Sequence, residues 1–178
     1  TVKEETAKRD GAVSFKKLSS SSKPEIYEMI ELYKHHLNQG RLDDEIYFNL
    51  GLCYLHLKLF DLAIRYFQKC LELAPDQPDY HYYLSLAKIR NRRPFTLMPN
   101  DIREVETYLS SALELDPEDG KYIILSIVLK YDYYHLNGLS VRGPLIGELI
   151  ERLASKKIDH YEIKRMQEMV PVADPKLI

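Results

Sequence analysis

The residues that could support acid–base chemistry are scattered along the chain. Its six histidines form no His-Glu-x-x-His or His-x-x-x-His pair; they are His35, His36, His56, His81, His135 and His160. The nearest approach to a catalytic pair is Asp132 with His135, because an i, i+3 spacing places two side chains on one face of a helix. No nucleophile motif, phosphate loop or dinucleotide fingerprint accompanies this pair. We therefore predict that the protein is not an enzyme and that it uses no cofactor and no metal.

A run of basic residues is the second group that could do chemistry. Lys88, Arg90, Arg92 and Arg93 place four positive side chains within six residues, and such a patch could hold phosphate, an acidic peptide or nucleic acid. The alternative is a solvated helix end, where cations are favoured by the helix dipole without any partner. A net charge of -2 and a pI of about 6.3 argue against a surface built for nucleic acid.

The composition is that of an ordinary globular chain. Of its 178 residues, 45% are hydrophobic and 29% are charged, which suits one soluble domain with a core. No apolar run approaches the roughly 18 residues needed to span a bilayer, and residues 1–10 do not resemble a signal peptide. We expect a cytoplasmic protein in which Cys53 and Cys70 are buried free thiols. The chain begins with Thr1, which leaves open that it is part of a longer protein.

One unit in the middle of the chain, residues 44–77, has a distinctive spacing. It reads Tyr47-x2-Leu50-Gly51-x2-Tyr54, then Ala63-x3-Phe67, then Pro75. This pattern predicts two helices joined by a turn, with Gly51 allowing the partner helix to approach closely. Asp61 is predicted to cap the start of the second helix, and Pro75 to fix the turn after that helix ends at Leu73 or Ala74.

These residues, with Cys70 at a small-residue position, resemble the tetratricopeptide repeat. The resemblance implies an all-α fold, a right-handed antiparallel helix-pair solenoid (superhelix) with about 7–8 helices. It also implies a protein-interaction scaffold or adaptor that holds a partner protein or peptide on a concave face lined by the first helices of the repeats. The resemblance is close for residues 44–77 and looser for the neighbouring segments.

The neighbouring segments depart from the template in places. Pro75 to Pro117 spans 42 residues against 34 for a regular repeat, which predicts an inserted loop at Arg90 to Pro99, followed by a capping pair, Asp101 and Glu104. Further helices are predicted over residues 26–37, 122–137, 145–153 and 159–169. We divide the chain into a flexible leader (1–23), a helical domain (24–170) and a tail (171–178). A short helix within residues 2–9 is the alternative for part of the leader.

The family register places the partner-binding surface on two first helices. Its predicted residues are Phe48, Asn49, Leu52 and His56 on the first, and Tyr82, Tyr83, Leu86 and Arg90 on the second. Asn49 matches an asparagine of relatives that clamp a C-terminal carboxylate, but the next first helix has Asp79 and Tyr83 where those relatives need basic residues. We therefore expect an aromatic groove rather than a carboxylate clamp, with at least half of the tyrosines used in packing.

Three hypotheses follow from the sequence. The leading one is a non-enzymatic adaptor that binds a partner peptide or protein on its first helices. The second is a module that binds an acidic ligand or nucleic acid through Lys88 to Arg93, and the third is a regulatory or oligomerising segment of a larger protein. The sequence does not predict the identity of the partner or the oligomeric state.

Overall fold

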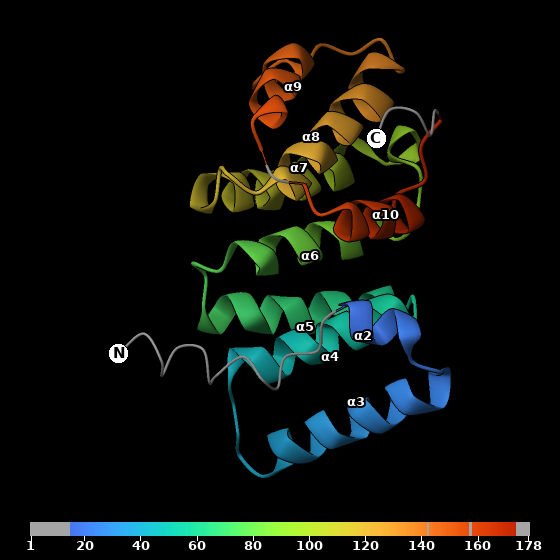
Figure 1. Ribbon diagram of the computed structural model, residues 1–178, viewed down its shortest axis with the longest axis vertical. Coiled ribbons are helices and arrows are strands. Elements are labelled where there is room, and N and C mark those ends of the chain that lie inside the picture. The colour runs from blue at the N-terminus through green and yellow to red at the C-terminus, as the bar shows by residue number, and fades with distance from the viewer. Residues whose placement is uncertain (1–14, 142, 157, 174–178) are drawn as a thin grey trace. The chain divides into compact units, whose positions relative to one another are not determined.

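Every regular element in the described residues is helical. The computed structural model describes residues 15–141, 143–156 and 158–173, and it confirms the predicted all-α fold (Figure 1). The α-helices are α2 (Phe15–Ser20), α3 (Lys23–Asn38), α4 (Asp44–His56), α5 (Phe60–Leu73), α6 (Pro78–Ile89), α7 (Pro99–Leu115), α8 (Gly120–Leu129), α9 (Ile146–Ala154) and α10 (His160–Met169). Two compact units, residues 1–74 and residues 75–178, divide the chain that the sequence predicts as one helical domain. No helix in the described ranges is both long and apolar enough to cross a bilayer.

In the first unit, α4 and α5 form the predicted hairpin. The Asp43 side chain accepts a hydrogen bond from the Ile46 N–H (2.8 Å) and thereby starts α4. Gly51 faces the ring of Phe67, and a Cβ at residue 51 would lie 2.5 Å from Phe67 Cε1. Gly51 therefore sets the close approach of the two helices, as predicted from its place in the motif.

The predicted cap of α5 is wrong. The helix begins one residue before Asp61, and Leu59 is its N-cap, so Asp61 lies in the first helical turn. An acidic side chain is favourable in the first turn as well, because it lies near the positive end of the helix dipole. The prediction that Pro75 follows the end of α5 is confirmed, since the helix ends at Leu73.

Two further helices of the first unit, α2 and α3, precede the hairpin. Phe15–Ser20, within the leader that the sequence predicts to be flexible, form α2, and Leu18 of this helix is fully buried. Burial of one leucine side chain is worth about 1.5–3 kcal/mol, which helps to offset the entropy lost when a short helix is ordered. Helix α3 buries Ile26 and Ile30 and confirms the helix predicted over residues 26–37. Residues 1–14 lie outside the described residues, and so does the alternative helix within residues 2–9.

In the second unit, α6 and α7 form another hairpin around the predicted insertion. Helix α6 ends at Ile89, and the left-handed backbone of Arg90 (φ 57°) and Asn91 (φ 53°) turns the chain out of the helix. The insertion contains a short 3-10 helix, η2 (Pro94–Thr96). The predicted cap at Asp101 and Glu104 is wrong: α7 begins at Pro99, whose missing N–H costs nothing at a helix start.

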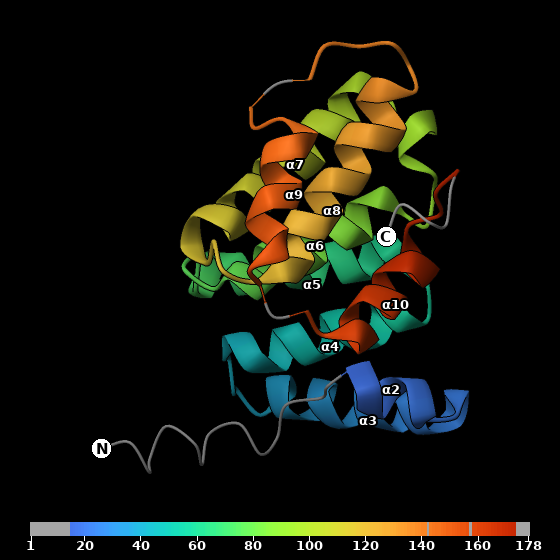
Figure 2. The ribbon, with the colours of Figure 1, turned by 45° about the horizontal axis from the view of Figure 1, so that its top comes forward.

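The remaining helices of the second unit pack around α8. This helix is apolar on nearly all sides, and its Ile123 and Ile127 pack against Leu149 of α9. Figure 2 shows α9 beside α8. A π-helix, η3 (Lys130–His135), extends α8, and the chain then turns at Gly138 (φ 67°). Helix α10 begins after its cap Asp159 and contacts α8.

Both cysteines are buried and free, as predicted. Burial raises the pKa of Cys53 to about 12, and burial likewise raises the pKa of Cys70. Because the thiolate is the reactive species, we expect neither thiol to react with Ellman's reagent at about pH 8 while the chain is folded. Unfolding in guanidinium should expose both cysteines of the sequence to the reagent. Rapid reaction of the native protein would contradict the burial of these side chains.

Candidate partner-binding surface

On α4, the predicted binding residues divide into a buried pair and an accessible pair. Asn49 and Leu52 are each 2% exposed, whereas Phe48 and His56 are only partly buried. The Phe48 ring packs at a tilt on Phe67 of α5, with 5.8 Å between ring centroids. Helix α2 also lies against α4. Of the four predicted residues on this helix, Phe48 and His56 are therefore the two with accessible surface, and the other two lie in the interior.

On α6, three of the four predicted residues lie in the interior. Tyr82, Tyr83 and Leu86 are 1%, 6% and 3% exposed, respectively. The Tyr82 ring meets Tyr83 edge-on (5.1 Å between centroids) and lies at a tilt to Tyr122 of α8 (5.3 Å). Arg90, just beyond the end of the helix, is exposed. The α6 tyrosines therefore act mainly in packing between first helices. This agrees with the prediction that at least half of the tyrosines are used in packing.

Helix α10 covers the side of α6 on which Tyr83 lies. The Tyr83 hydroxyl donates a hydrogen bond to Glu162 Oε2 at 3.2 Å. Burial raises the pKa of Glu162, and it also raises the pKa of Tyr83 well above its usual value. Three side chains of α10 are buried: Ile163, Arg165 and Met166. The first-helix side of α6 is thus partly occupied by a later helix of the same chain.

A second polar contact joins α6 to the start of α8. The Tyr122 hydroxyl donates to Asp79 Oδ1 at 2.7 Å, and Lys121 Nζ lies 2.8 Å from the same carboxylate and 2.8 Å from that of Asp119. Burial opposes the charge on Lys121, but the two carboxylates outweigh it and raise its pKa. Asp79 therefore holds the two first helices together, at the position where a carboxylate clamp would need a basic residue.

The basic run is largely paired within the second unit. Lys88 Nζ lies 2.6 Å from Glu104 Oε1, and the Arg92 guanidinium lies 2.9 Å from Asp101 Oδ2. The two residues predicted to cap α7 are thus the partners of the basic run. Arg93 pairs with Asp132. Three of the four cations hold the insertion and α6 to neighbouring elements, which reduces the charge they can offer to a ligand.

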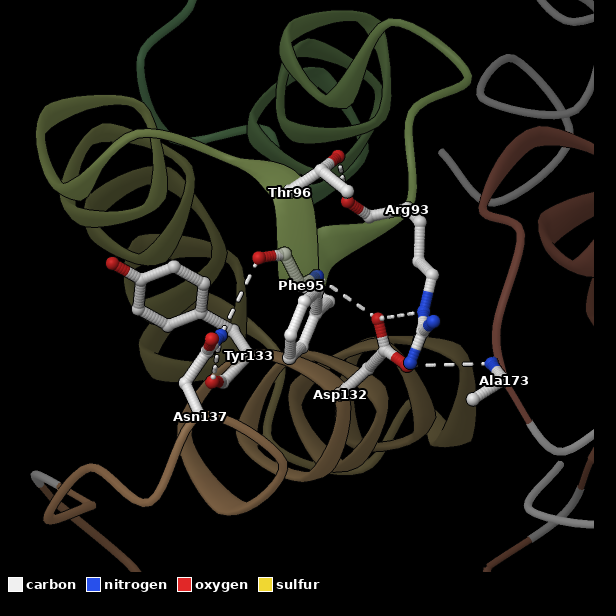
Figure 3. Close-up of polar contacts among 7 residues, drawn as sticks. All are labelled: Arg93, Phe95, Thr96, Asp132, Tyr133, Asn137 and Ala173. Carbon is white, nitrogen blue, oxygen red and sulfur yellow. Dashed lines mark hydrogen bonds and ion pairs between the residues drawn. The ribbon is translucent and has the colours of Figure 1, made fainter.

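The buried carboxylate of Asp132 joins three distant segments (Figure 3). The Arg93 side chain reaches both of its oxygens, with Nε 3.0 Å from Oδ1 and 3.1 Å from Oδ2. The backbone N–H groups of Phe95 (2.9 Å) and Ala173 (3.3 Å) also donate to it. Asp132 is 0% exposed, so it needs this set of donors. We call Asp132, Arg93 and the Phe95 and Ala173 amides the Asp132 cluster.

The Asp132 cluster changes the interpretation of the nearest catalytic candidate. Asp132 is directed to its donors in the cluster, while the exposed His135 ring stacks on Tyr131, with 5.2 Å between centroids. Both residues lie in the π-helix η3, whose i to i+5 bonding alters the i, i+3 geometry assumed for an α-helix. The structure therefore does not join Asp132 and His135 into an acid–base pair.

Comparison with known protein families agrees with the hairpin geometry of α4 and α5. The family described as tetratricopeptide repeat matches residues 45–77. A search of curated proteins found no similar sequence. Repeats of this family generally mediate protein–protein interaction and point to a non-catalytic module. The chain thus carries one matched tetratricopeptide repeat, at residues 45–77, within a fold whose described elements are all helical.

Proposed function

We propose that the chain is a non-enzymatic adaptor that holds a segment of a partner protein against the first helices of its hairpins. The observation that carries this proposal is the matched repeat at residues 45–77, folded as the α4–α5 hairpin. In such repeats the first helix lines the binding side, and α4 is the first helix of the matched repeat. The partner would therefore contact α4 through Phe48 and His56 in the first unit. In the second unit, Arg90, just after α6, is the predicted residue that is exposed.

Rigidity is the physical basis of the proposed binding. Asn49 and Leu52 on α4, and Tyr82 and Tyr83 on α6, are fixed by packing before a partner arrives. A preorganised surface avoids the ordering cost of about 0.5–1.5 kcal/mol for each side chain that binding would otherwise immobilise. The ion pairs of the basic run also support an adaptor over an anion-binding module, because most of that charge is already used within the chain.

Substitution of the two accessible α4 residues tests the proposal. We expect a Phe48→Ala, His56→Ala variant to capture roughly tenfold less partner from the native lysate, because large side chains at the centre of an interface carry most of the binding energy. The matched control is Arg65→Ala, Gln68→Ala, which alters two exposed residues of the second helix, α5. Circular dichroism would verify that both variants are folded. Equal capture by the wild type and the α4 variant would contradict the proposed surface.

A further inference from the structure

A groove in the second unit lies outside the residues assigned to partner binding. It consists of two adjoining hollows, of about 360 Å³ and about 620 Å³, which share Ile158 and His160 as lining residues. The first hollow runs between α8, the end of α9 and α10, and the second lies at the starts of α8 and α10. We call the two together the α8–α10 groove. The volume of each hollow falls within the range of roughly 300–1,000 Å³ that is typical of ligand sites.

The first hollow has an apolar floor. Ile124 and Ile127 of α8 are 6% and 5% exposed, and Ile163 of α10 is 8% exposed. Leu153 and Ile158 form partly buried walls, and polar groups such as Lys164 lie at the rim. A hollow lined by branched aliphatic side chains suits one large apolar side chain of a partner. Burial of such a side chain stabilises the complex in proportion to the apolar area that is removed from water. This is the mode in which helical peptides anchor in grooves.

The second hollow supplies a negative charge beside that floor. Its carboxylates belong to Asp116, Glu118, Asp119 and Asp159. Two of them are already paired, Asp119 with Lys121 and Glu118 with Lys156. Asp119 and Asp159 also cap α8 and α10, and each helix start offsets about half a charge. Because Lys121 also pairs with Asp79 outside the hollow, roughly one to two net negative charges remain, which attract a lysine or arginine and repel an acidic residue.

We infer that the α8–α10 groove binds a partner segment in which a large apolar side chain lies next to a single lysine or arginine. The apolar side chain enters the hollow over Ile124, Ile127 and Ile163, and the basic residue reaches the carboxylates of Asp116 and Asp159. Lys164, which lines the first hollow, disfavours a second cation along the groove. The inference goes beyond the proposed function, because neither α4 nor α6 contributes a residue to this groove.

Two synthetic peptides serve as probes. The first combines leucine with lysine, and the second has the same length and leucine positions with glutamate in place of lysine. We expect the leucine–lysine peptide to bind the intact chain, as measured by fluorescence anisotropy, and the leucine–glutamate peptide to bind roughly tenfold more weakly because of like-charge repulsion. Equal affinity for the two peptides would overturn the assigned charge preference.

Substitutions within the groove locate the binding. Asp116→Asn, Asp159→Asn removes two charges, yet asparagine can still accept the bonds that these carboxylates accept from the Glu118 and Tyr161 N–H groups. We expect this variant to bind the leucine–lysine peptide roughly fivefold more weakly, and Ile158→Gln to weaken it as well. The control is Asp76→Asn, Glu114→Gln, which makes the same change in net charge at exposed residues outside the groove.

The outcomes separate this inference from the proposed function. Weaker binding in both groove variants, with unchanged binding in the control and in Phe48→Ala, His56→Ala, supports the groove. Loss of binding only in the α4 variant would overturn the groove while supporting binding on the first helices. Sedimentation would show whether the chain self-associates; self-association lost in the groove variants would mean that a second copy occupies the groove and would overturn the inference.

Discussion

Replacing Arg93 with methionine is expected to lower the free energy of unfolding by about 3 kcal/mol, as measured by urea denaturation. Asp132 is 0% exposed and Arg93 is its charged partner, with the side chain of the arginine 35% exposed. Methionine keeps part of the apolar stem of the arginine but leaves the carboxylate, among the described residues, with the Phe95 and Ala173 N–H groups as donors. A buried charge without its counter-charge is strongly destabilising, and the partial exposure of Arg93 sets the expected value at the low end of the usual range of about 3–5 kcal/mol.

Two comparisons make this result specific to the Asp132 cluster. Arg92→Met removes the neighbouring arginine, whose pair with Asp101 is 40% and 42% exposed, and should cost no more than about 1 kcal/mol. Adding Asp132→Asn to Arg93→Met should recover part of the loss, because the unpaired carboxylate is then gone. If Arg93→Met were no more damaging than Arg92→Met, the Asp132 cluster would not hold the insertion and η3 together.

Replacing Gly51 with alanine is expected to lower the free energy of unfolding by about 2 kcal/mol, although alanine favours a helix by about 1 kcal/mol. The added Cβ would lie 2.5 Å from Phe67 Cε1 and 2.7 Å from Phe67 Cδ1. Phe67 is 0% exposed, so its ring cannot move into solvent to relieve the contact. The α4–α5 hairpin must therefore open slightly, and urea denaturation would measure the cost.

The matched control for Gly51 is Gly147 of α9. Among the described residues, nothing lies within 4 Å of a Cβ added at Gly147, so Gly147→Ala should stabilise the chain by up to about 0.5 kcal/mol, less than in a helix interior because Gly147 lies in the first turn of α9. Combining Gly51→Ala with Phe67→Leu should cost less than the sum of the two single changes, because the smaller side chain makes room for the Cβ. Additive effects would show that Gly51 and Phe67 are not in the contact described.

The α4–α5 hairpin could be predicted because its determinants are local. Helical spacing and close packing are indicated within one short stretch by Leu50, Gly51, Ala63 and Phe67, and Pro75 marks the end of the second helix. The helix starts were less predictable. Asp61 and Asp101 each lie in a first turn rather than at a cap, because a helix can begin a residue or two earlier without a side-chain cap. The spacing of apolar residues indicates that a helix is present, but it does not define the first residue of that helix.

The polar contacts of the second unit could not be predicted for a different reason. Arg93 and Asp132 are 39 residues apart, and Tyr83 and Glu162 are 79 residues apart. A sequence pattern indicates that a tyrosine or an arginine is present, but pairing depends on which helices lie side by side. Asp132 carried one signal that could have been used: an acidic residue among apolar and aromatic neighbours needs a partner when that helix is buried.

Site-specific photo-crosslinking tests the proposed adaptor function most directly. A benzoylphenylalanine at residue 48, on α4, would be compared with one at residue 68, on α5, in chains exposed to native lysate. We expect the residue-48 probe to form a crosslink to a partner protein and the residue-68 probe to form none. A partner crosslinked from residue 68 but not from residue 48 would contradict binding on the first helix of the matched repeat.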